Sequence, residues 1–134
     1  MNTQTMVQEA GAVRSSLMEA MGDLTLAMEN DMQAREAARN AKQNYEDGEL
    51  EVAADALVNA TGKNAETRKA EVDLILVRAR QQGGALFALW HNSLNATYAA
   101  QDTSMALEQA KARFTAVKHA TDLTAAMLNA MAAK

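Results

Sequence analysis

The 134-residue sequence contains no cysteine and no proline. Without cysteine the chain has neither a disulfide nor a thiolate that binds zinc or attacks a substrate, which fits a reducing compartment. Proline costs about 3 kcal/mol in a helix interior and commonly ends a helix, so its absence favours long uninterrupted helices. Aromatic residues make up only 4% of the chain, and many of its hydrophobic residues are alanine. This composition is typical of thin packing between two or three helices.

We also expect neither a secretion signal nor a membrane-spanning segment. The N-terminus MNTQTMVQEA has no basic stretch followed by an apolar one, so we expect no signal peptide. The most apolar window, residues 84–100, contains a histidine and two asparagines and is shorter than the roughly 20 residues that cross a bilayer. We therefore expect a cytoplasmic protein with no membrane partner.

Motifs of enzyme chemistry are absent as well. The only two histidines, His91 and His119, lie 28 residues apart. Neither belongs to a Glu-x-x-His or His-Glu-x-x-His pair, the spacings at which helices hold di-iron or zinc. No strand leads into a glycine-rich phosphate loop, and the serines have no base and acid nearby in the sequence. We expect no catalytic residue, no metal, no cofactor and no enzyme activity.

Apolar residues in the first part of the chain follow a heptad, which predicts the seam of a coiled coil or of a long bundle helix. The seam positions, mostly four and three residues apart, are Met6, Ala10, Val13, Leu17, Ala20, Leu24, Ala27, Ala34, Ala38, Ala41, Tyr45 and Val52. Asp31 also falls on the seam, where a carboxylate is unfavourable. We expect Met28 and Met32, which lie beside it, to take over the apolar stripe there.

Glycines suggest where the helices end. Gly48 lies within the heptad, and because the pattern recovers afterwards we expect the helix to continue through it. Gly62 suits the left-handed position that closes a helix, and Asn64 suits the N-cap of the next. Gly83 and Gly84 are expected to kink or hinge the second helix, although no cap residue supports a full break.

These signals predict an all-α fold in a single helical domain, residues 1–134. The first arm covers about 5–60, a turn covers 61–64, and the second arm covers about 65–132 with a kink at 83–84. A short turn between long helices favours a long antiparallel helical hairpin or coiled-coil-like bundle. The alternative is a compact three- to four-helix bundle folded back at Gly48 and Gly83-Gly84. A lone hairpin leaves the stripe around Phe87 and Trp90 half covered, so we expect a homo-oligomer.

Charge is distributed unevenly along the chain. Residues 1–60 carry 11 acidic and 4 basic side chains, whereas residues 61–134 carry 6 acidic and 9 basic ones. The densest basic group follows the predicted turn and comprises Lys63, Arg68, Lys69, Arg78 and Arg80. It indicates either a contact for nucleic acid or an acidic partner, or an ordinary solvated face, because acidic residues are interleaved with it. The net charge of −4 disfavours non-specific DNA binding.

A motif at the predicted turn carries a resemblance to a known kind of protein. The residues Gly62-Lys63-Asn64-Ala65-Glu66-Thr67-Arg68, preceded by a helix that carries Tyr45, resemble small phage-encoded helical-hairpin proteins of the early or recombination region. The C-terminal arm from Phe114 to Met131 looks similar to theirs, whereas Gly83-Gly84 and the high alanine content depart from the pattern. The resemblance implies a phage or host protein partner and a location in the bacterial host cytoplasm.

Three functions follow as hypotheses. The first is a non-enzymatic protein–protein interaction module that modulates phage or host DNA metabolism as a phage-encoded accessory protein. The second is a structural or assembly protein, such as a scaffold or virion component. The third is a nucleic-acid binder that uses the basic hairpin tip. The residues expected to contact a partner are Lys63, Arg68, Lys69, Arg78, Arg80, Phe87 and Trp90.

Overall fold

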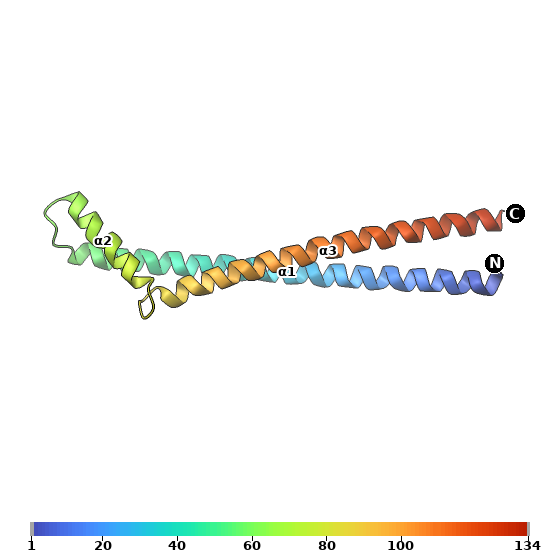
Figure 1. The fold of residues 1–134 in the computed structure, drawn as a ribbon, viewed down its shortest axis with the longest axis horizontal. Helices are drawn as coiled ribbons and strands as arrows, with labels where there is room; N and C mark the ends of the chain where they lie inside the picture. The colour runs from blue at the N-terminus through green and yellow to red at the C-terminus, as the bar shows by residue number, and fades with distance from the viewer. Residues whose placement is uncertain (1, 134) are drawn as a thin grey trace. The chain divides into compact units, whose positions relative to one another are not determined.

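The computed structural model describes residues 2–133 and contains three helices in that range, α1 (Thr3–Asn59), α2 (Ala65–Ala79) and α3 (Phe87–Ala132) (Figure 1). No strand occurs among the described residues, so the all-α prediction is confirmed. Contacts divide the chain into unit 1, with described residues 2–32 and 102–133, and unit 2, Gln33–Gln101. Helices α1 and α3 contribute to both units.

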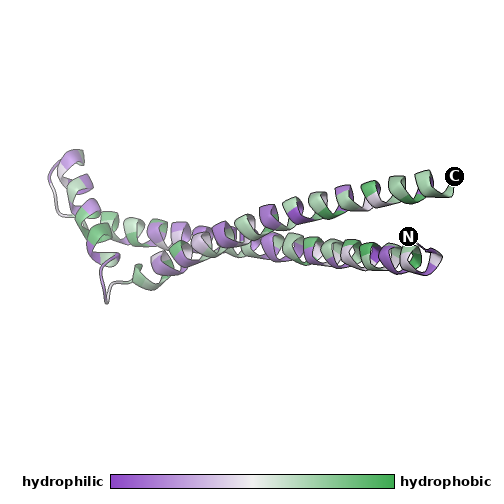
Figure 2. Ribbon diagram, turned by 45° about the vertical axis from the view of Figure 1, so that its right-hand side comes forward, coloured by the Kyte–Doolittle hydropathy of each residue, from purple (hydrophilic) through white to green (hydrophobic). Residues whose placement is uncertain are grey.

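The heptad predicted for the first arm corresponds to the least exposed face of α1. With the exception of Ala10, which is exposed, every predicted seam residue from Met6 to Val52 is buried or half-buried. The helix passes through Gly48 without interruption, as expected. Hydrophobic and hydrophilic residues alternate along the ribbon of each helix (Figure 2), which matches helices that each cover one apolar face.

Asp31 is where the seam prediction is wrong. Its side chain is buried, at 4% exposure, whereas Met28 and Met32 point to solvent. The hydroxyl of Thr103 on α3 donates a hydrogen bond to Asp31 Oδ1 at 3.1 Å. Burying a polar group is tolerated when a hydrogen bond replaces its lost water. The aspartate therefore stays on the seam, and the methionines do not replace it.

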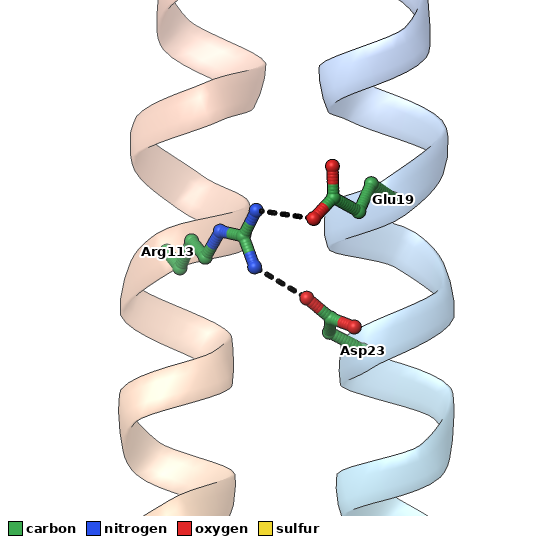
Figure 3. A network of polar contacts seen from close by, with 3 residues as sticks. All are labelled: Glu19, Asp23 and Arg113. Atoms are coloured by element: carbon green, nitrogen blue, oxygen red, sulfur yellow. Dashed lines mark hydrogen bonds and ion pairs between the residues drawn. The ribbon is translucent and has the colours of Figure 1, made fainter.

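Unit 1 consists of the N-terminal part of α1 packed against the C-terminal part of α3 in the opposite direction (Figure 1). The guanidinium of Arg113 joins them by pairing with two carboxylates one turn apart on α1, Glu19 at 3.3 Å and Asp23 (Figure 3). Leu107 and Ala20 are the buried apolar residues of this unit. Ala20 belongs to the predicted seam, and the ion pairs of Arg113 lie beside it.

Unit 2 begins its second helix at the predicted cap. Asn64 Oδ1 accepts hydrogen bonds from the backbone N–H and the hydroxyl of Thr67, both at 2.8 Å, so the N-cap prediction is confirmed. The left-handed conformation predicted for Gly62 is wrong, because Gly83 is the only described residue with a positive φ. The lack of a side chain at Gly62 instead lets the loop pack close to Thr67, because a Cβ at position 62 would lie 2.7 Å from Thr67 Cγ2.

The second arm contains a true break where a kink was expected. Helix α2 ends at Ala79 and α3 starts at Phe87, and Gly83 adopts a φ of +84° between them, a conformation that favours glycine. A Cβ on Gly84 would lie 2.3 Å from the carbonyl oxygen of Ala79. That carbonyl accepts a hydrogen bond from the Leu86 N–H at 2.8 Å, which closes the turn.

Leu86 ends this turn as the most completely buried large side chain, at 1% exposure. It packs over Gly48 of α1, where a Cβ would lie 3.1 Å from Leu86 Cδ2 and 2.8 Å from Leu89 Cδ1. The glycine in the middle of α1 therefore admits the two leucines, and the helix continues past it.

Candidate interaction surface

The structure places all seven predicted contact residues in unit 2 but does not gather them at one site. Lys63 lies in the α1–α2 loop, Arg68, Lys69 and Arg78 lie on α2, and Arg80 is the C-cap of α2. Phe87 and Trp90 lie in the first turn of α3. Of the seven residues, only Arg68 and Lys69 line a common groove, which lies between α1 and α2.

Arg80 forms a polar cluster that holds α2 to α1. Its Nε donates to the hydroxyl of Tyr45 at 2.6 Å, and a terminal guanidinium nitrogen donates to Glu49 Oε2 at 3.1 Å. Tyr45 and Glu49 lie one turn apart on α1, so that one guanidinium reaches both. The Arg80 guanidinium is therefore occupied within the chain, which distinguishes Arg80 from the exposed basic residues of α2.

The contacts within the cluster shift the pKa values of Tyr45, Glu49 and Arg80. The hydrogen bond from Tyr45, helped by Arg80, lowers the pKa of Glu49. Burial, followed by the hydrogen bond to Glu49, raises the pKa of Tyr45. The hydrogen bonds to Glu49 and Tyr45 raise the pKa of Arg80. At neutral pH the carboxylate and guanidinium are thus charged and the phenol is neutral, so the guanidinium donates to one carboxylate and one hydroxyl oxygen.

A groove lies between α1 and α2 in unit 2. It has a volume of about 540 Å3 and is mostly apolar. Its lining residues are Leu50, Ala53, Ala54 and Leu57 from α1 and Ala65, Arg68, Lys69 and Val72 from α2. A groove with an apolar floor and a few charged groups at its edge is a common form of binding site for small molecules and for helices.

The two basic side chains of the groove, Arg68 and Lys69, differ in their exposure to solvent. Arg68 is half-buried and donates to the carbonyl oxygen of Gly62 at 3.4 Å. Lys69 is exposed. Glu71, on another face of α2, accepts from the N–H and hydroxyl of Thr61 at 2.9 and 3.3 Å and so fixes the loop at the end of the groove. The groove thus has a stable wall that carries one exposed cation.

No protein-family model, curated protein or solved structure matches this chain. The resemblance to phage-encoded hairpin proteins therefore stays a prediction, and any function rests on the residues themselves. Among the described residues, no helix is long and apolar enough to cross a membrane, and no group of three or more metal-binding side chains lies close enough together to hold an ion.

The aromatic residues predicted to contact a partner pack locally. The ring of His91 lies 4.3 Å from that of Phe87 and 5.2 Å from that of Trp90, measured between centroids. Phe87 is half-buried, and Trp90 is among the least exposed of the exposed apolar residues. The three rings form a cluster on the first turns of α3, away from the residues that line the groove.

The sequence did not predict that Leu50 and Leu57 line a groove, although Leu57 was part of the apolar pattern expected to recover after Gly48. Leu50 and Leu57 are spaced by seven, one heptad apart, but fall off the main seam. That offset is the signal of a second apolar face, which the more regular seam obscures. Leu50 is 70% exposed, and Val58, next to Leu57, is 84% exposed. Large apolar side chains in and beside the groove are thus in contact with water.

Proposed function

We propose that the chain is a non-enzymatic helical interaction protein that works as a homo-oligomer. The observation that carries the proposal is the number of large hydrophobic side chains that each unit leaves exposed to water. Among residues 2–133, eighteen large hydrophobic residues are exposed, whereas only five hydrophobic residues are buried. Apolar surface on this scale is normally covered by a partner or by a second copy.

The test is the mass of the full chain in solution. Sedimentation equilibrium between about 1 and 100 μM, the range in which weak to moderate dimers dissociate, should give a mass above that of one chain. A single-chain mass over the whole range would reject the proposal. Binding of the dye 1-anilinonaphthalene-8-sulfonate, which reports exposed apolar surface, should fall as the chain associates.

The biological setting of this proposal comes from the resemblance and extends it. A phage-encoded accessory protein that modulates phage or host DNA metabolism would use the oligomer to contact a phage or host protein. Its test is affinity purification of the full chain from the bacterial host, in which recovery of replication or recombination proteins is expected. Recovery of virion or scaffold proteins would favour the structural alternative.

Direct binding to nucleic acid is the less supported alternative. Arg80 is held by Tyr45 and Glu49, and Arg68 is bonded to Gly62, which leaves fewer free cations at the predicted tip. A basic interface would show affinity that falls steeply with salt, because phosphate contacts release counterions. Absence of a gel shift at low salt would remove this alternative.

A further inference from the structure

The groove of unit 2 combines apolar area with two basic side chains, Arg68 and Lys69. Leu50 and Leu57 line it and are largely exposed, and Val58 next to them is the most exposed large hydrophobic residue in the described chain. Lys69 of α2 provides a cation at its edge. A surface of this kind requires a partner that presents both an apolar ridge and a carboxylate.

The opposite edge of the same α1 segment carries that carboxylate. Successive residues are rotated by about 100° around a helix. Starting from Ala53, which faces α2, the direction around α1 runs through Leu50 and Ala54 to Glu51. Glu51 therefore lies beside the apolar ridge, on the side away from α2, and it is exposed. One short segment of α1 thus has the features that the groove requires.

We propose that a second copy of this chain occupies the groove in a two-fold symmetric dimer, an inference that rests on the homo-oligomer proposed above. A two-fold axis parallel to α1 sets the two α1 segments side by side in the same direction. Leu50 and Leu57 of the two copies then meet along a short heptad seam. The same rotation brings α2 of each copy, with Lys69, against Glu51 of the other, so that each contact occurs twice.

A stable interface buries about 800 Å2 on each partner, so exposed residues beside the groove, such as Val58, join Leu50 and Leu57 in the contact. The competing surface is the row of exposed methionines Met18, Met21, Met28 and Met32 in unit 1. Methionines adapt to many partners with little specificity, whereas the groove pairs apolar area with matched charges. We therefore assign the groove to the second copy.

Two charge reversals on the full-length chain test the assignment. Lys69→Glu and Glu51→Lys are both at exposed positions and should leave the helical content unchanged by circular dichroism. Each variant by itself places like charges opposite one another twice in the dimer. Sedimentation equilibrium should therefore show the dimer dissociation constant raised at least about tenfold for each.

Mixing the two variants gives the sharpest outcome. In a dimer of one Lys69→Glu chain with one Glu51→Lys chain, both contacts again join opposite charges. The mixture should thus form a heterodimer with a dissociation constant close to that of the wild type, although neither variant associates well by itself. A mixture that stays as weakly associated as its components would overturn the inference.

Control variants distinguish this inference from the broader proposal. Leu50→Gln in the groove should weaken the dimer, whereas Met32→Gln and Lys118→Glu in unit 1, which are also exposed, should not. An oligomer that resists every groove variant but dissociates with Met32→Gln would reject the groove and keep the proposed function. A wild-type chain that stays a monomer would reject both.

Discussion

Unit 1 and unit 2 share helix α1 but differ in what lies against it. In unit 1 a single helix segment packs along the α1 seam, and long regular stretches of both helices contribute alanines, threonines and a few larger residues. In unit 2 the chain turns twice, so that α2 and the start of α3 both lie against α1. The comparison shows that a repeated seam needs few special residues, whereas two turns need glycines, a cap and a polar cluster at defined positions.

The largest expected effect is a loss of stability when a buried leucine is truncated, and it should differ between unit 1 and unit 2. Leu86→Ala in unit 2 removes the most buried large side chain and should lower the free energy of unfolding by about 2–5 kcal/mol. Leu107→Ala in unit 1, where the leucine is 9% exposed, should cost less, because water reaches part of that site. Urea denaturation followed by circular dichroism measures both. A larger loss for Leu107→Ala would show that the two-helix core carries more of the stability.

Two glycine substitutions, one in each unit, should change the stability by an intermediate amount and in opposite directions. Gly84→Ala in unit 2 forces a Cβ against the carbonyl of Ala79 and should destabilise the chain by about 2–4 kcal/mol. Gly22→Ala in unit 1 meets nothing within 4 Å and should stabilise α1 by about 0.5–1 kcal/mol. Thermal unfolding midpoints should move in opposite directions. Equal shifts would contradict the distinction between turn glycines and helix glycines.

The smallest expected effect concerns pH and the Tyr45–Glu49–Arg80 cluster. Because folding lowers the pKa of Glu49 from 4.5, its contribution to stability is present above pH 4.5 and is lost as pH falls through the lowered pKa. Tyr45, whose pKa is raised from 10.0, contributes below pH 10 and loses that contribution as pH rises through its raised pKa.

Glu49→Gln should therefore lower stability by about 1 kcal/mol or less at pH 7, since the cluster is partly exposed to solvent. The difference from the wild type should shrink below pH 4. Tyr45→Phe should remove much of the same acid-side dependence, because the tyrosine hydroxyl is the main cause of the lowered pKa. Urea titrations at several pH values provide the measurement. A difference that grows as the pH falls would contradict a lowered pKa for Glu49 in the folded chain.

The features that the sequence predicted well are those set by periodicity. The seam from Met6 to Val52 depends only on spacing, and spacing can be read without knowing the partner helix. The Asn64 cap was predictable for a similar reason, since its partner lies three residues away. Such local rules operate within one or two helical turns.

The features that the sequence did not predict depend on contacts distant in the chain. The burial of Asp31 requires Thr103, 72 residues away, and the break at Gly84 requires the carbonyl of Ala79 to face a residue without a side chain. The groove exists only once α2 lies beside the offset leucines Leu50 and Leu57. None of these partners is implied by the spacing of the residues involved.

Asp31 also bears on how the two helices of unit 1 find their alignment. A repeated heptad offers almost equivalent packing when one helix slides by seven residues, because alanines and small aliphatic residues recur along both seams. Sliding α3 by one heptad in either direction would set Ala96 or Ala110 opposite the carboxylate in place of Thr103, and a methyl group donates no hydrogen bond. A single aspartate thus penalises the slipped pairings, and it gives a monotonous, alanine-rich interface one preferred alignment.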